Sequence, residues 1–295
     1  MGEPGPAPTF KSLERDGYHA QAATYGDRPG RLTRQAIAPM LEAVAARRGM
    51  RLLDLCCGPG YGAGEAAARG LDAIGIDIAA GMVAEARRGF PAATFDEGDA
   101  EALTFPDDSF DAVICPFGLL HLPEPDKAIG EVFRVLKANG RFAATVWAPP
   151  ERADLLRLAV AAITAHADMN VNMPPGPSLF MLSDPAVALG KLKRAGFVDT
   201  GHQELPIVYR SPDAAAVWDW FDRGTVRSVM LVRLQTPEIQ ARIREAIIES
   251  ARRYETSEGL EYPILPSCTL PASLPRAVAG DQRGRFRGGS RRQAR

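Results

Sequence analysis

Cysteine is scarce in this sequence, and neither sign of charge is in excess. Four cysteines occur in 295 residues, and no two of them are spaced as C-x-x-C. This spacing indicates neither a zinc site nor a disulfide framework, so we expect reduced thiols and no bound metal. The formal net charge of -1 gives the chain as a whole no attraction to nucleic acid or to an anionic membrane surface.

Long hydrophobic runs are also missing. No apolar stretch approaches the roughly 20 residues that a membrane-spanning helix needs. The first eight residues are rich in proline and glycine, without the basic and then apolar pattern of a signal peptide. We therefore expect a cytoplasmic protein without a membrane span. Its 46% of hydrophobic residues is ordinary for a globular protein.

Short apolar strands alternate with helical segments between residues 51 and 147. This alternation predicts an α/β fold with a doubly wound, mostly parallel sheet. The predicted strands are 51–55, 72–76, 93–97, 110–115 and 141–147, and the helices among them are 62–69, 79–88 and 127–136. Residues 31–48 have helical periodicity, so the core is expected to span 31–149 after a partly disordered segment, 1–30.

After residue 150 the alternation stops. Segments 150–180 and 211–256 contain amphipathic helices and a proline-rich loop, and we interpret them as helical insertions that cap the sheet within residues 150–265. Residues 266–295 are rich in Pro, Gly, Ser and Arg, which predicts a disordered basic tail; a nucleic-acid-binding arm is the alternative. Because proline removes a ladder donor, the prolines after Ile264 predict a truncated last strand.

The most informative segment is LLDLCCGPGYG, residues 52–62, a predicted strand followed by a glycine turn and a helix. Gly58, Gly60 and Ala63 match the G-x-G-x-x-G/A fingerprint, so dinucleotide binding is one interpretation. Asp77 follows the second strand, where its carboxylate suits two ribose hydroxyls; a helix-capping role is the alternative. Asp54 would repel a pyrophosphate but suits a positively charged ligand.

Two further segments favour a ligand other than a dinucleotide. Asp99 and Ala100 follow the third strand, where the carboxylate can accept a hydrogen bond from an adenine amino group and the backbone N–H of Ala100 can serve a ring nitrogen. The segment LLHL, residues 119–122, follows the fourth strand and contains His121.

Together these motifs resemble class I S-adenosylmethionine-dependent methyltransferases, and especially the branch with the ubiquinone and menaquinone C-methyltransferases and many small-molecule methyltransferases. The resemblance spans residues 15–265 and is strongest over 50–147. It implies a Rossmann-like, seven-stranded sheet with a reversed last hairpin and S-adenosyl-L-methionine across the strand ends. It also implies ligand contacts from Asp54, Gly58 and Gly60 (methionine), Asp77 and Ile78 (ribose), Asp99 and Ala100 (adenine), Cys115 (methyl) and the N-terminal aromatic Tyr25.

Candidates for the acceptor side of the site are less specific. His121 is predicted as a general base, with a packing role as the alternative. His166 is a second histidine that faces either substrate or solvent. Phe117, Met173 and Phe180 are predicted to contact an apolar acceptor, although helix packing explains most apolar residues of the cap. The pair at i, i+4, Arg223 and Arg227, either binds a substrate carboxylate or faces solvent.

The expected function is methyl transfer from S-adenosylmethionine to carbon or oxygen of a small hydrophobic or aromatic molecule, with no nucleic acid as partner. One alternative is a non-catalytic S-adenosylmethionine-binding protein. The other is a dinucleotide-dependent oxidoreductase, which Asp54 and the motif after the third strand oppose. The identity of the acceptor and the oligomeric state do not follow from the sequence.

Overall fold

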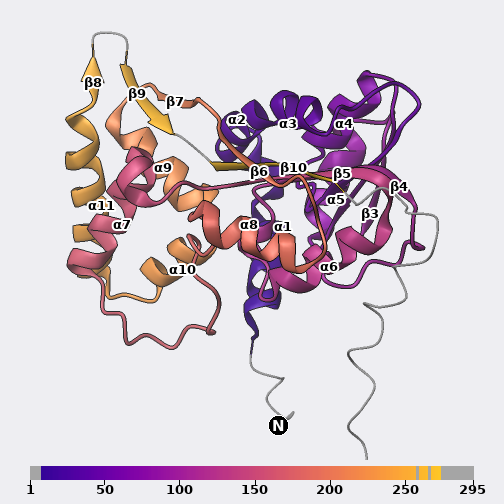
Figure 1. Ribbon diagram of the computed structural model, residues 1–295. Coiled ribbons are helices and arrows are strands. Elements are labelled where there is room, and N and C mark those ends of the chain that lie inside the picture. Colours follow the sequence, from indigo (N-terminus) through magenta and orange to yellow (C-terminus); the bar gives the residue numbers. More distant parts are fainter. Residues whose placement is uncertain (1–7, 257–258, 265–266, 274–295) are drawn as a thin grey trace, which may run out of the picture.

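A large sheet flanked by helices stands beside a mostly helical block with a sheet of its own (Figure 1). The structure, a computed structural model, describes residues 8–256, 259–264 and 267–273. Among these residues, no helix has the length and apolar character to cross a membrane.

Seven strands form the large sheet in the order β3-β2-β1-β4-β5-β10-β6. Their bounds are β1 (Arg51–Leu55), β2 (Asp72–Asp77), β3 (Thr94–Glu97), β4 (Phe110–Pro116), β5 (Leu136–Val146), β6 (Gly201–Glu204) and β10 (Ser267–Ser273). Strands β1 to β5 are mutually parallel, whereas β10 is antiparallel to both β5 and β6. The predicted doubly wound α/β class is therefore confirmed.

The predicted truncation of the last strand is wrong. Residues 259–264 form β9 (Gly259–Ile264) of the smaller sheet, and β10 completes the large one. Strand β10 pairs with β6 as far as Leu270, and its pairing with β5 shifts register between Thr269 and Ala272. Pro271 lies within this irregularity. Proline is tolerated there because a bulged strand residue does not need to donate to the ladder. Residues 267–273 of the predicted tail thus belong to the sheet, and 274–295 lie outside the described residues.

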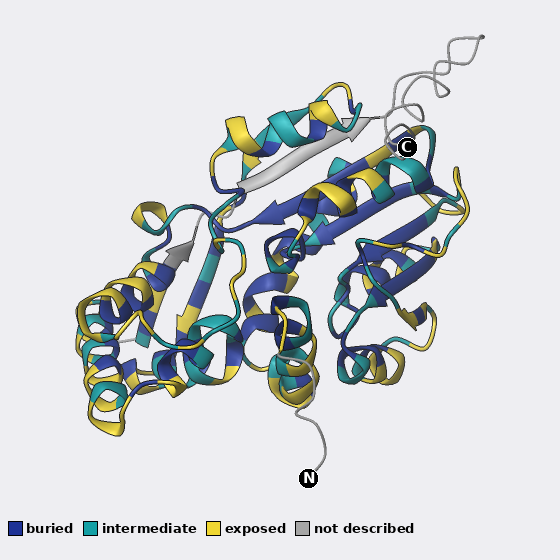
Figure 2. Ribbon diagram, turned by 90° about the horizontal axis from the view of Figure 1, so that it is seen from below, coloured by how far each residue is buried: buried dark blue, intermediate teal, exposed yellow. Residues whose placement is uncertain are grey.

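Helices cover both faces of the large sheet. In Figure 1, α2 (Pro29–Thr33), α3 (Ile37–Ala43) and α4 (Tyr61–Ala68) lie above it, and α6 (Pro125–Val135) and α8 (Pro185–Arg194) lie below. The remaining core helices are α5 (Ala80–Gly89) and the short η1 (Arg34–Ala36). Figure 2 shows the central strands in the colour of buried residues, as expected for a parallel sheet packed on both faces.

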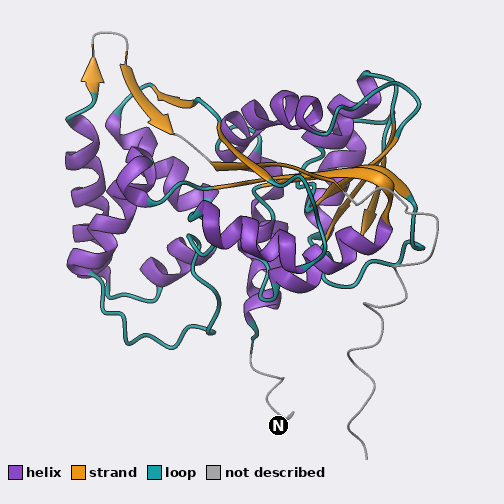
Figure 3. Cartoon of the chain, in the orientation of Figure 1, coloured by secondary structure: helices purple, strands orange, loops and turns teal. Residues whose placement is uncertain are grey.

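The second block, here named the cap, is mostly helical (Figure 3). It contains η3 (Pro150–Arg152), α7 (Asp154–His166), α9 (Ala214–Gly224), α10 (Arg227–Arg233) and α11 (Pro237–Arg252). Two of these helices begin at side-chain caps, because Asp213 accepts a hydrogen bond from the N–H of Ala216 and Thr236 from that of Ile239. Its small sheet, β7 (Ile207–Ser211), β9 and β8 (Glu255–Thr256), is antiparallel and was not predicted.

An N-terminal helix joins the two blocks. Helix α1 (Phe10–Tyr25) begins at a capping box in which Thr9 and Ser12 satisfy each other's backbone N–H groups. One side packs on α5, where the ring Nδ1 of His19 accepts a hydrogen bond from the N–H of Gly81. The other side packs on α9 and the segment after it. The segment 1–30, expected to be partly disordered, thus contains the helix Phe10–Tyr25, and residues 1–7 lie outside the described residues.

Candidate functional site

A cavity lies at the carboxyl ends of β1, β2 and β4, where open α/β sheets bind their ligands. Helix α1 and the cap form the opposite wall. The sequence-predicted residues that line this cavity are Tyr25, Gly58, Asp77, Ile78, Asp99, Ala100, Phe117, His121, Phe180 and Arg227. Residues predicted to bind the cofactor and residues predicted to contact the acceptor therefore line the same cavity.

Asp77 ends β2 and is fixed by two backbone donors. Its Oδ2 accepts a hydrogen bond from the N–H of Gly58 at 2.9 Å, and its Oδ1 accepts one from Ala79 at 2.9 Å. Burial raises the pKa of this carboxyl, and the two N–H groups oppose that shift. Each carboxylate oxygen keeps further acceptor capacity, so the group suits a vicinal diol.

The two loop glycines have different roles. Gly58 has φ of +53°, and a Cβ added there would meet no atom within 4 Å, so it would project into open space. Gly60 has φ of +88°, and a Cβ there would lie 2.8 Å from the side chains of Ala86 and Phe95. Gly58 therefore leaves room for a ligand, whereas Gly60, which does not line the cavity, lets the loop pack against the core.

Asp54 does not line the cavity. Its side chain is fully buried, and its Oδ2 accepts a hydrogen bond from the N–H of Ala63 at 2.8 Å, at the start of α4. Its Oδ1 has no partner among the described groups, and burial raises its pKa to about 7. Asp54, predicted to contact the methionine part of the ligand, therefore lies behind the glycine loop and not on the cavity wall.

Asp99 and Ala100 lie in the loop after β3. Oδ1 of Asp99 accepts a hydrogen bond from the N–H of Glu101 at 2.9 Å, and Oδ2 accepts one from Nζ of Lys11 at 2.7 Å. Lys11, on α1, also pairs with Glu101. The carboxylate predicted to bind adenine thus also holds α1 against the sheet.

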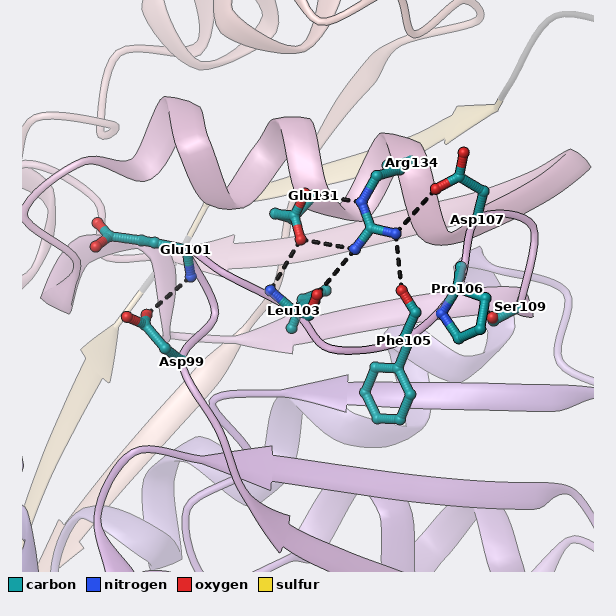
Figure 4. A network of polar contacts seen from close by, with 9 residues as sticks. All are labelled: Asp99, Glu101, Leu103, Phe105, Pro106, Asp107, Ser109, Glu131 and Arg134. Carbon is teal, nitrogen blue, oxygen red and sulfur yellow. Dashed lines mark hydrogen bonds and ion pairs between the residues drawn. The ribbon is translucent and has the colours of Figure 1, made fainter.

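Arg134 of α6 anchors the same loop (Figure 4). Its Nη1 donates to the carbonyl oxygen of Phe105 at 2.7 Å and its Nη2 to that of Leu103 at 3.0 Å. Glu131 accepts from Arg134 at 2.7 and 2.8 Å and also from the N–H of Leu103 at 2.8 Å. The loop is therefore tied to the core helix α6 as well as to α1.

His121 stands between two side chains of α1. It ends the short helix η2 (Leu119–His121), its Nδ1 lies 2.9 Å from Oε2 of Glu14, and its Nε2 lies 3.1 Å from the hydroxyl of Tyr18. All three residues line the cavity, and the Glu14 side chain is only 6% exposed. Sequence reasoning missed Glu14 and Tyr18, although their i, i+4 spacing would place them on one helix face.

Aromatic side chains form the acceptor side of the cavity. Phe117 stacks on Trp147 with ring centroids 4.2 Å apart, and Phe180, Trp220 and Phe221 complete the wall. Phe117 has φ of 54°, an uncommon backbone conformation for a non-glycine residue. Its N–H donates to the hydroxyl of Thr145 at 3.0 Å, which holds it there.

Cys56 replaces Cys115 as the cysteine on the cavity wall. Cys115 is fully buried and does not line the cavity, whereas the neighbouring Cys56 does, with φ of 55°. The Cys56 thiol is hydrogen-bonded to Cys115, and this contact and burial raise its pKa well above the usual range. Of the two thiols, that of the half-buried Cys56 and not that of Cys115 is therefore at the cavity wall.

Other predicted residues lie elsewhere. Met173, His166 and Arg223 do not line this cavity, whereas Arg227 does. Arg223 instead pairs with Asp219 at 3.0 Å. Within the described ranges, no three His, Cys, Asp or Glu side chains gather as metal ligands.

Comparisons with known proteins show what the chain is similar to. A family model described as "Methyltransferase domain" matches residues 53–144. Demethylmenaquinone methyltransferase of Renibacterium salmoninarum is 40% identical over 111 residues, which are 38% of this chain and 47% of that protein. The same-named protein of Clavibacter sepedonicus is 32% identical over 182 residues, 56% of this chain and 72% of that protein. The chain spans about half the length of the first two curated relatives.

A solved structure shares the fold. The YcgJ protein from Bacillus subtilis superposes with a TM-score of 0.51 at 21% identity, covering 82% of this chain and 99% of that one. The identity is too low to carry more than the fold. The match over most of the Clavibacter sepedonicus protein shows the family. The chain belongs to the class I S-adenosylmethionine-dependent methyltransferases, in the branch with the menaquinone and ubiquinone enzymes.

Proposed function

We propose that this protein transfers the methyl group of S-adenosylmethionine to a carbon or oxygen atom of a small apolar or aromatic molecule. One observation carries the proposal: a single cavity has Asp77, Asp99 and Ala100 on one wall and an aromatic chamber with a hydrogen-bonded histidine on the other. The named relatives, which are demethylmenaquinone methyltransferases, support an apolar ring as the acceptor.

The residues present fit the cofactor. Asp77 would accept the ribose hydroxyls, Asp99 and the N–H of Ala100 would bind the adenine, and the open space above Gly58 would take the methionine part. The orphaned Oδ1 of Asp54, buried behind this loop, would accept from a water bridging to the ammonium group. When bound, S-adenosylmethionine supplies a methyl group made electrophilic by the sulfonium.

Glu14, His121 and Tyr18 would remove a proton from the acceptor. With Nδ1–H of His121 donating to Glu14, its Nε2 is left to accept a proton from the hydroxyl of Tyr18. Burial raises the pKa of Tyr18 well above its ordinary value, so the tyrosine would relay a proton from an acceptor hydroxyl without first ionising. The apolar walls would exclude water and orient the ring.

Calorimetry with S-adenosylhomocysteine tests the proposal. The wild-type chain should bind it and should not bind NAD, and Asp77→Ala should weaken binding about 100-fold because two hydrogen bonds to a charged acceptor are lost. Asp72→Ala, an exposed carboxylate on the same strand, is the matched control and should change nothing. A folded sample that fails to bind S-adenosylhomocysteine would contradict the proposal.

Substitution of His121 tests the proton path separately. His121→Gln should keep the affinity for S-adenosylhomocysteine and slow methylation of a hydroxyl acceptor. Unchanged turnover would remove His121 from the mechanism while leaving the cofactor assignment intact. Binding of the cofactor product without methylation of any acceptor in a broad aromatic panel would favour the non-catalytic alternative.

A further inference from the structure

Arg227 is a cation in an otherwise aromatic part of the cavity. It is the first residue of α10 and lines the cavity together with Phe10 and Phe221. Its guanidinium carbon lies 5.1 Å from the centroid of the Phe10 ring, and its Nη1 donates to the carbonyl oxygen of Pro177 at 2.8 Å. These contacts hold the guanidinium in the cavity and occupy one of its five N–H donors.

Neighbouring arginines of the cap have carboxylate partners, and Arg227 does not. Arg223 pairs with Asp219 at 3.0 Å and Arg233 with Asp222 at 3.7 Å. In the part of the chain that the structure describes, no carboxylate lies within ion-pair distance of Arg227. Burial lowers its pKa, and Glu14 attracts it only from beyond that distance.

The position of Arg227 does not serve the stability of its own helix. A cation at a helix N-terminus is disfavoured by the helix dipole. Partial burial of a charge without a partner also costs free energy. A ligand that brings an anionic group to this place would offset both costs, and a carboxylate matches the fixed, planar fork of donors.

We infer that Arg227 binds a carboxylate of the methyl acceptor, so that the acceptor is an aromatic or apolar acid. This inference rests on the proposed function and names the substrate class of the same cavity. Lys11, the other cation on this wall, is already paired with Asp99 and Glu101, which leaves Arg227 to take the anion.

The cofactor also carries a carboxylate, but it would lie at the other end of α1. The methionine part is expected above Gly58, which shares a small recess with Tyr25 at the end of the helix. Phe10, beneath Arg227, is at its beginning, and at 1.5 Å per residue the two aromatic residues are separated by about 22 Å along the helix. The carboxylate that binds Arg227 is therefore assigned to the acceptor and not to the cofactor.

The test uses 6-hydroxy-2-naphthoate and its uncharged amide as probes, titrated into the full chain saturated with S-adenosylhomocysteine. The wild type should bind the acid about tenfold more tightly than the amide. Arg227→Gln should reduce the affinity for the acid to that of the amide, leave the amide unchanged, and leave S-adenosylhomocysteine binding unchanged. Arg223→Gln, on the same segment but paired with Asp219, should alter none of the three.

Each other outcome overturns the inference in a distinct way. Equal binding of acid and amide by the wild type, or no binding of the acid, would show that the cavity does not select a carboxylate. Weaker S-adenosylhomocysteine binding by Arg227→Gln would show that Arg227 contacts the cofactor and not the acceptor. A wild type that binds no S-adenosylhomocysteine would instead contradict the proposed function itself.

Discussion

Two carboxylates on neighbouring strands, the fully buried Asp54 and the half-buried Asp77, differ in how their charge is satisfied. Both oxygens of Asp77 accept backbone N–H groups, whereas Asp54 has one donor from Ala63 and one oxygen without a partner. Because Asp54 is fully buried, its ionised form is disfavoured and its pKa rises to about 7. At neutral pH this group is therefore poised between its two charge states.

The raised pKa predicts a pH-dependent loss of stability. Between about pH 4 and pH 7 the folded protein holds a proton on Asp54 that the unfolded chain has released, so the free energy of unfolding falls as pH rises. The loss from this residue is on the order of 4 kcal/mol, and Asp54→Asn, which does not titrate, should lack it. Urea unfolding of both proteins from pH 4 to 8 measures this difference.

The free energy of unfolding of Asp54→Asn, relative to that of the wild type, should increase as the pH rises. The amide oxygen can still accept from Ala63, so the start of α4 should be preserved. Asp72→Asn, an exposed position on β2, should follow the wild-type pH profile. Parallel profiles for the wild type and Asp54→Asn would mean that Asp54 titrates near its ordinary value.

At this scale the sequence predicted those cavity residues that directly follow a strand. Asp77 and Asp99 are placed by chain order, because parallel strands bring their carboxyl ends to one edge of the sheet. Arg227 was already considered from the sequence, as one of two arginines that either bind a substrate carboxylate or face solvent. Glu14 and Tyr18, in contrast, reach the cavity through packing between segments far apart in the chain, so their helix spacing alone does not show which residue they face. Their roles were therefore beyond prediction from the sequence alone.

Among the elements, α6 has a task that its amphipathic pattern does not reveal. The sequence predicts a helix at 127–136, and the structure adds that Arg134 holds the loop carrying Asp99 and Ala100. Replacing this side chain removes hydrogen bonds to two backbone carbonyl groups and leaves Glu131 without its cation. The loop should then hold the adenine end of the site less firmly.

Arg134→Met should therefore weaken S-adenosylhomocysteine binding about tenfold and lower the melting temperature. Arg87→Met is a matched control, because Arg87 also donates to a backbone carbonyl, that of Phe95, and to the carboxylate of Asp96. It should lower stability without changing affinity. If both variants lost stability and neither lost affinity, the loop would not depend on Arg134 for ligand binding.

The last strand shows where element prediction failed. Proline argued against a strand after Ile264, but β10 pairs on both sides and shifts register around Pro271. A bulge depends on both neighbouring strands, so a single segment does not reveal it. Asn139 lies within β5, at the register shift against β4, and takes the left-handed φ of 63° that asparagine tolerates.

On the scale of the whole molecule, α1 connects the core and the cap. It packs on α5 and on α9, and Gln21 donates to the carbonyl oxygen of Thr225 at 2.9 Å. Near its start, Lys11 is paired with Asp99 at 2.7 Å and with Glu101. Since α1 forms one wall of the cavity, these contacts hold that wall against the core and the cap.

Lys11→Met should speed release of S-adenosylhomocysteine about fivefold, which corresponds to about 1 kcal/mol for a partly exposed ion pair. Arg15→Met removes an exposed pair with Asp16 on the same helix and should leave release unchanged. Stopped-flow displacement measures both rates. Equal release rates in Lys11→Met and the wild type would show that α1 does not restrain the ligand.

The place of β10 in the sheet has a consequence for synthesis of the protein. Strands β1 to β5 leave the ribosome in one continuous stretch and pair with one another, but β6 joins the sheet only through β10, the last described strand. In a nascent chain that has not yet reached residue 267, β5 is therefore an edge strand without its β10 neighbour, in the same sheet that forms the wall of the cavity. Exposed strand edges recruit other strands, so this interval is when the chain most needs protection from aggregation.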